Sequence, residues 1–237
     1  MGMCMNDQTT FSGFPPEGRQ FLRDLAANNN RAWFEAHKDT YQTKLLGPAV
    51  DYVVAVGARL QALDQAIRFD TRTNGQGTLM RIHRDTRFSQ DKSPYKTAVA
   101  GIFWDGAGKK MERPAFGFHM AADQLELMAG MFQFDKPQLA AYRASVAADG
   151  PGTELLSAFV AVRGAGNYEI LGEQFKRVPQ GFDPDHPRAD WLRYSGLYVS
   201  PAGGVREGLS DPELVEVTID HFRNMAPVYH WLKRYVG

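Results

Sequence analysis

Apolar residues in the first quarter of the chain recur at the three- and four-residue intervals of an α-helix. This spacing predicts helices across residues 15–64. The apolar positions that define it are Phe21, Leu22, Leu25, Val53, Val56, Leu60 and Leu63. Asn29 or Asn30 can cap the helix that follows them, and Pro48 suits the first turn of the next one.

The pattern changes to period two over residues 66–134, which predicts β-strands. A strand through residues 79–83 would place alternate side chains on opposite faces. One face would hold Met80 and Ile82, and the other would hold Leu79, Arg81 and His83.

Residues 99–104 are apolar on both faces, which is typical of a central strand. The two alternating runs that follow predict a hairpin, with Met120 and Leu125 on its buried face. That parity places His119 opposite Glu126 on the other face of the hairpin.

Helical spacing returns after residue 135, and each predicted helix has a start signal. Asp135 can cap one helix, and Gly150-Pro151 opens another. The run SDPE at residues 210–213 predicts a capping box with proline just inside the final helix. Pro227 should then kink or split that helix, because proline lacks the donor and clashes with the preceding turn.

These elements predict an α+β fold, in which a central, mostly antiparallel sheet at about residues 66–134 is flanked by N-terminal and C-terminal helices. Residues 1–10 show no periodicity, and we expect them to be a disordered lead. No repeat or long linker divides the remainder. We therefore expect residues 11–237 to form a single α+β domain.

Composition narrows the class of protein. The 237 residues are 43% hydrophobic and 23% charged, as in soluble globular proteins. The N-terminal lead lacks the basic and apolar stretches of a secretory signal, and no window has the roughly 18 apolar residues of a membrane span. We expect a cytoplasmic protein with no membrane partner. The single cysteine, Cys4, excludes an internal disulfide and a cysteine-based zinc site.

Charge is distributed unevenly within a neutral chain. Lysine and arginine number 27, as do aspartate and glutamate, so no overall field attracts nucleic acid or an acidic membrane. Residues 81–96, here called the basic segment, nevertheless have a net charge of +3. Their charged residues are Arg81, Arg84, Arg87, Lys92 and Lys96, with only Asp85 and Asp91 in opposition.

Four runs of sequence resemble an uncharacterised family of unknown function, numbered 2461. They are NNNRAWF at residues 28–34, RIHRDTRF at 81–88, DKSPYK at 91–96 and KRVPQGF at 176–182. The resemblance spans roughly residues 11–236. It implies a shared fold and a shared surface, and it supplies no reaction.

Arginine presents a planar fork of donors that suits carboxylate and phosphate, and lysine adds a compact charge. We therefore expect a cationic pocket that binds a small molecule bearing one of these groups. Its predicted ligand-binding residues are Arg81, Arg84, Arg87, Lys92, Lys96, Asp85 and Asp91. Phe88 and Pro94 are expected to anchor the loop, and His83 and Tyr95 are the candidate proton carriers if the protein is an enzyme.

Two other functions stay open: a nucleic-acid-binding module, disfavoured by the neutral net charge, and a protein-interaction domain in which the basic segment is a structural network of salt bridges. No nucleophile elbow, Walker loop or dinucleotide-binding glycine motif is present. We expect no cofactor and no metal, although His83, Asp85, His119 and Glu126 could meet if their strands were neighbours. The sequence does not indicate an oligomeric state.

Overall fold

A computed structural model describes residues 10–172 and 174–237, so Cys4 and most of the predicted lead lie outside the described residues. The helices are α1 (Pro16–Ala27), α2 (Arg31–Ala36), α3 (Lys38–Thr40), the π-helix η1 (Tyr41–Leu46), α4 (Gly47–Leu63), α5 (Lys136–Ala147), α6 (Asp149–Ala165) and α7 (Leu214–Tyr235), with short 3₁₀ turns η2 (Lys110–Glu112) and η3 (Trp191–Arg193). The strands are β1 (Ile67–Arg68), β2 (Val99–Asp105), β3 (Ala115–Met120), β4 (Leu125–Met131), β5 (Tyr168–Leu171) and β6 (Leu197–Pro201).

The predicted N-terminal helices are confirmed. Phe21, Leu22 and Leu25 form the buried stripe of α1. Asn30 caps α2, because its side-chain oxygen accepts from the Trp33 N–H at 3.0 Å. Pro48 lies in the first turn of α4, as expected, and the π-helix η1 leads directly into that turn.

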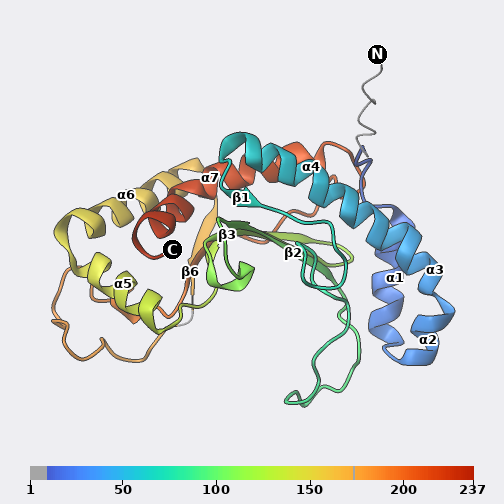
Figure 1. Cartoon of the computed structure of the whole chain (residues 1–237), viewed down its shortest axis with the longest axis horizontal. Helices are drawn as coiled ribbons and strands as arrows, with labels where there is room; N and C mark the ends of the chain where they lie inside the picture. The colour runs from blue at the N-terminus through green and yellow to red at the C-terminus, as the bar shows by residue number, and fades with distance from the viewer. Residues whose placement is uncertain (1–9, 173) are drawn as a thin grey trace.

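The strands form one antiparallel sheet in the order β1-β2-β3-β4-β6-β5 (Figure 1). The α+β fold and the central position of β2 are therefore confirmed. The hairpin register is also confirmed, since His119 pairs with Glu126 and Met120 with Leu125. The sheet extends beyond residues 66–134, because β5 and β6 add to the edge of β4 from the C-terminal half.

The predicted strand at residues 79–83 is wrong. The segment first follows β2, where Met80 N–H donates to Ala100 O at 2.8 Å. It then leaves β2 and pairs with residues 94–96, where Lys96 N–H donates to Ile82 O at 2.8 Å. Because the partner changes between these residues, strict alternation fails, and Leu79 and Ile82 are both buried.

Helices α4 and α7 cover one face of the sheet (Figure 1). The alternate side chains of the strands that point to this face form aromatic contacts with the helices. Phe118 meets Tyr52 of α4 at a centroid distance of 5.0 Å, and Phe116 meets Phe222 and Tyr229 of α7 at 4.9 and 4.5 Å. The other side chains of the same strands face the opposite way, where a cavity lies over the sheet.

The start of α7 differs from its prediction. Ser210 does not cap the helix, which begins at Leu214; its hydroxyl instead donates to Phe14 O at 2.8 Å and ties the preceding turn to the N-terminal segment. Nor does Pro227 split the helix, which runs to Tyr235. Buried residues on both sides of the proline, among them Phe222 and Leu232, hold the two halves of α7 against the core. None of the described helices is long and apolar enough to span a bilayer.

A charged cluster fixes the C-terminal end of α7 to the sheet edge. Lys233 Nζ lies 2.8 Å from Asp105 Oδ1 on β2 and 2.5 Å from Asp64 Oδ2 at the end of α4. Arg113 contacts the second Asp105 oxygen at 3.3 Å, and the Asp105 side chain is only 6% exposed. A carboxylate in such a place is stable only while its cations remain, since an unpaired buried charge is costly.

Replacing Lys233 by methionine keeps the apolar stem and removes the ammonium group from this cluster. Because Arg113 still contacts Asp105, we expect a loss of about 2 kcal/mol in the free energy of unfolding by urea. The matched control is Lys109→Met, which breaks an exposed pair with Glu112 and should leave stability unchanged. Equal effects of the two substitutions would show that the cluster does not stabilise the fold.

The Lys233 cluster also predicts how the stability of the fold depends on pH. Burial raises the pKa of Asp64, but the bond from Lys233 and the N–H of Ala66 outweigh it, so the pKa lies below its ordinary value. Burial lowers the pKa of Lys233, but Asp105 and Asp64 outweigh it, so that pKa lies above its ordinary value. The Asp64 contribution is present above about pH 4 and lost as pH falls; the Lys233 contribution is present below about pH 10 and lost as pH rises. The stability difference between wild type and Lys233→Met should therefore be largest near neutral pH and shrink at both extremes, as urea titrations across pH would measure.

Candidate functional site

The basic segment folds into a short paired stem and a loop. Residues 82–84 pair with residues 94–96, through Arg84 N–H to Pro94 O at 2.8 Å and an isolated bridge between His83 and Tyr95. The loop between them projects away from the sheet (Figure 1). Phe88 in this loop is 94% exposed, so the expectation that Phe88 anchors the loop is wrong.

Three of the five cations are satisfied within the basic segment itself. Arg87 forms two bonds with Asp85, at 2.9 and 2.7 Å. Lys92 Nζ donates to Thr86 O at 3.0 Å. Arg84 pairs with Asp91, whose pKa is held well below its usual range by the Ser93 hydroxyl and N–H and by Arg84 itself. These pairs agree with the structural salt-bridge alternative for this part of the segment.

The other two cations differ. Within residues 10–172 and 174–237, no carboxylate lies within ion-pair distance of Arg81 or Lys96. The Lys96 side chain is partly buried, and burial together with the Arg81 charge lowers its pKa. Lys110 extends the same positive region, since burial and the charge of Lys96 lower the pKa of Lys110 as well.

The two candidate proton carriers lie in an aromatic stack. Tyr95 is only 3% exposed and stacks on Phe34 of α2 at a centroid distance of 4.0 Å, with 13° between the ring planes. His83 packs against the Tyr95 ring at 5.1 Å. This stack holds the stem of the basic segment against α2, and it gives both residues a packing role.

Asn29 joins the corner between α1 and α2 to the stem. Its amide nitrogen donates to Tyr95 O at 2.9 Å, and its amide oxygen accepts from Tyr95 N–H at 3.1 Å. A side chain amide has one acceptor and two donors, so a single asparagine satisfies both backbone groups of Tyr95. Sequence reasoning treated Asn29 as a helix cap and missed this contact, which links the NNNRAWF run to the DKSPYK run.

A cavity of about 350 Å³ lies beside this contact, and we call it the Lys96 pocket. It is lined by Ala26, Asn29, Arg84, Asp91, Ser93, Tyr95, Lys96, Thr97, Ala98 and His119. Of the predicted ligand-binding residues, the structure therefore brings Arg84, Asp91 and Lys96 to one cavity. Arg81, Asp85, Arg87 and Lys92 do not line it, and neither does the candidate His83.

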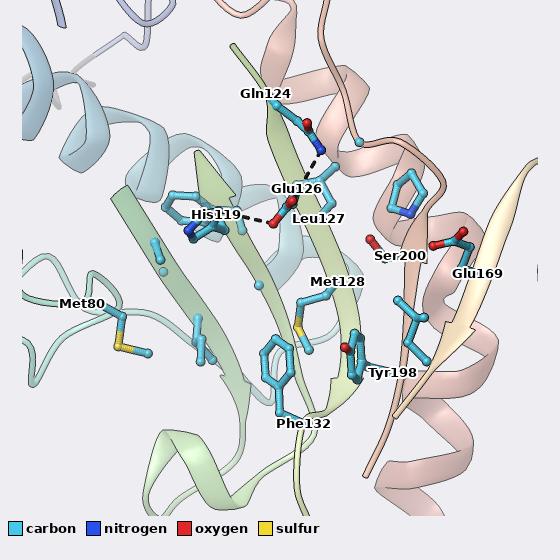
Figure 2. Close-up of a pocket in the computed structure, with 18 of the residues that line it drawn as sticks. Met80, His119, Gln124, Glu126, Leu127, Met128, Phe132, Glu169, Tyr198 and Ser200 are labelled. Carbon is cyan, nitrogen blue, oxygen red and sulfur yellow. Dashed lines mark hydrogen bonds and ion pairs between the residues drawn. The ribbon is translucent and has the colours of Figure 1, made fainter. Parts of the chain in front are cut away.

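A second cavity, of about 460 Å³, lies over the sheet face opposite α4 and α7, and we call it the sheet groove. Figure 2 shows His119 and Glu126 joined across β3 and β4, with Met128, Phe132 and Tyr198 further along the groove. His119 Nδ1 lies 3.3 Å from one Glu126 oxygen, and Gln124 donates to the other Glu126 oxygen at 3.4 Å. His119 lines both cavities.

Several groove residues lie on strands that the sequence reasoning missed. Tyr198 and Ser200 of β6 and Glu169 of β5 line the groove. The signal was present, because Leu197 and Val199 are buried and alternate with Tyr198 and Ser200. Five residues of alternation were too short to compete with the helical patterns around them.

The four side chains considered as a conceivable metal site do not come together. His119 pairs with Glu126, whereas His83 packs on Tyr95 and Asp85 pairs with Arg87. Among the residues the structure describes, no group of three histidine, cysteine, aspartate or glutamate side chains is arranged to hold a metal ion. The KRVPQGF run also lies elsewhere, since Lys176 and Arg177 line a separate hollow beside Arg143.

Comparison with protein-family models matches residues 17–231 to one family, described as "Conserved hypothetical protein (DUF2461)". The match includes all of the residues that line the Lys96 pocket and the sheet groove. No curated protein and no solved structure matches the chain.

The contact between Asn29 and Tyr95 can be tested by Asn29→Leu, which removes both bonds and leaves two backbone groups without partners. We expect a loss of about 1–3 kcal/mol in the free energy of unfolding. The Tyr95 amide should also exchange with solvent at least about tenfold faster, because it loses its acceptor. Asn28→Ala is the control, since the Asn28 side chain donates to Asp24 O of α1 and not to the stem. Unchanged exchange at Tyr95 in Asn29→Leu would contradict the assignment.

Proposed function

The chain belongs to the conserved hypothetical protein family DUF2461, and we propose that its Lys96 pocket binds the carboxylate or phosphate group of a small molecule. The observation that supports this most directly is Lys96 itself. Lys96 lines a polar cavity, its side chain is partly buried near Arg81, and no carboxylate lies within ion-pair distance of it in the described part of the chain. A bound anion would supply the missing opposite charge.

The surrounding groups favour an anion of small size. Arg84 uses one nitrogen for Asp91, and its guanidinium carries further N–H donors. Thr97, which carries a hydroxyl, also lines the pocket. A carboxylate or phosphate between Arg84 and Lys96 would accept charge-assisted hydrogen bonds, which are about twice as strong as neutral ones.

The size of the pocket also weighs against nucleic acid. Specific nucleic-acid interfaces cover roughly 1,000 Å² or more of protein surface and use many phosphate contacts. Two arginines outside the pocket are already paired with carboxylates, Arg87 with Asp85 and Arg72 with Asp70. A pocket of about 350 Å³ is far smaller than such an interface, which favours a small ligand.

Lys96→Gln tests this function directly. Loss of one charge-assisted hydrogen bond should weaken binding of inorganic phosphate or sulfate about tenfold to a hundredfold by calorimetry. Lys92→Gln is the matched control, because it removes the same charge from the same segment at a lysine already bonded to Thr86 O. We expect less than a twofold change for the control. Equal losses in the two variants would point to general charge attraction, and absence of binding by the wild-type protein would refute the function.

Sulfate also allows a pH test, because its charge does not change between pH 7 and pH 10. The pKa of Lys96 is lowered by burial and by Arg81, so its ammonium should deprotonate at lower pH than an ordinary lysine. As pH rises, sulfate affinity should therefore begin to fall before the pH reaches about 10.4, the usual pKa of lysine. In Lys96→Gln this fall should be absent.

A further inference from the structure

The Lys96 pocket and the sheet groove are neighbouring parts of one surface. His119 lines both cavities. Ala98 lines the pocket and Ala100 lines the groove, and these residues lie two positions apart where the chain enters β2. Two residues of extended chain span about 7 Å, so a molecule of ordinary size held in the pocket would reach the groove.

The floor of the groove is low and apolar. Gly117 of β3 lies between Ile102 of β2 and Met128 of β4 in the sheet register. A Cβ atom at Gly117 would come within 2.9 Å of the Met128 sulfur, so the Met128 side chain lies directly over this glycine. The glycine therefore lets Met128 lie flat on the middle strands and form an apolar floor.

The walls present apolar side chains to solvent. Phe132 is 48% exposed and Met111 is 56% exposed, and Met80 and Met128 also line the groove (Figure 2). Methionine is flexible and polarizable, and it adapts to apolar ligands of irregular shape. An apolar group lying in the groove would remove this surface from water, which is favourable in proportion to the area covered.

Charge has a direction across this surface. Two cations, Arg84 and Lys96, and one carboxylate, Asp91, line the pocket beside the start of β2, which leaves it with a net positive charge. The carboxylates in the groove lie further across the sheet, with Glu126 on β4 and Glu169 on β5. A ligand that matches both regions has its negative charge at one end only.

We infer that the ligand is an amphipathic anion, whose carboxylate or phosphate binds in the Lys96 pocket and whose uncharged apolar body lies in the sheet groove. This inference rests on the proposed function of the Lys96 pocket. It adds the class of molecule to which the anionic group belongs. The combined space is in the range of ordinary small-molecule sites, which measure roughly 300–1,000 Å³.

A series of alkyl carboxylates tests the inference by calorimetry on the full chain. From butanoate to hexanoate to octanoate, each added methylene should strengthen binding about fourfold, the value expected for a buried methylene, until the groove is filled. Octanedioate has the length of octanoate with a second carboxylate at the far end. It should bind at least about tenfold more weakly than octanoate, because that carboxylate would lie in apolar surroundings near Glu169.

Two exposed phenylalanines provide a matched pair of variants. Phe132→Ala removes a wall of the groove and should weaken octanoate binding at least about threefold while leaving butanoate unchanged. Phe175→Ala removes a ring of similar exposure, 45%, that lies outside the groove, and should change neither. Both positions lie at the surface, so both variants should fold.

The outcomes separate this inference from the proposed function. If all carboxylates bind with equal affinity and Lys96→Gln weakens them, the pocket assignment stands and the groove assignment is overturned. If 1-octanol binds as tightly as octanoate, the link between the two cavities is overturned, because the charged group then adds nothing. If neither sulfate nor any carboxylate binds to the wild-type chain, both assignments are overturned.

Discussion

The one-sided covering of the sheet is the constraint on which the remaining structure depends. Helices α4 and α7 bury one face through rings such as Phe116 and Phe118, and the cluster at Lys233 fixes the far end of α7 to that face. Since strand side chains alternate, the residues between these rings must face away from the helices. Gly117, His119 and their neighbours are therefore placed on a second face, which the sheet holds rigid without filling it. A rigid and uncovered face is suited to binding.

The same covering explains why the N-terminal helices matter to the site. Helix α1 and the corner after it pack beside the sheet, which brings Asn29 to the backbone of Tyr95, 66 positions later in the chain. Two hydrogen bonds from one amide fix both the distance and the orientation of the stem. The stacking of Tyr95 on Phe34 fixes its tilt. The Lys96 pocket is thus formed largely by two runs that are distant in the sequence. The Asn29 amide joins these runs and so places both on one surface.

Apart from the start of α7, elements whose stabilising contacts are local could be predicted, and elements whose contacts are distant could not. The hairpin of β3 and β4 was predicted to the residue, because the parity of Met120 and Leu125 allows one register. The helices with local caps, such as the one after Asp135, were predicted for the same reason. Strands β5 and β6 are short and are joined by a long loop, so their pairing arises only in the folded chain. Residues 79–83 pair first with β2 and then with residues 94–96, so the two-residue alternation of a single strand does not describe them.

The basic segment shows the same limit at the level of single charges. Its count of cations drew attention to the right part of the chain, yet the count could not distinguish cations that are already neutralised from those that are not. Arg87 lies two positions from Asp85, and Lys92 six positions from Thr86, so the loop satisfies them by itself. Lys96 follows the loop in the stem, and its pocket is completed by residues of α1 and β3; Asp91 also lines that pocket but pairs with Arg84, and no carboxylate of the described residues lies within ion-pair distance of Lys96. A charge that the fold partly buries and does not neutralise is a stronger indication of a ligand than a larger number of charges in solvent, because only the former costs free energy that an anion can recover.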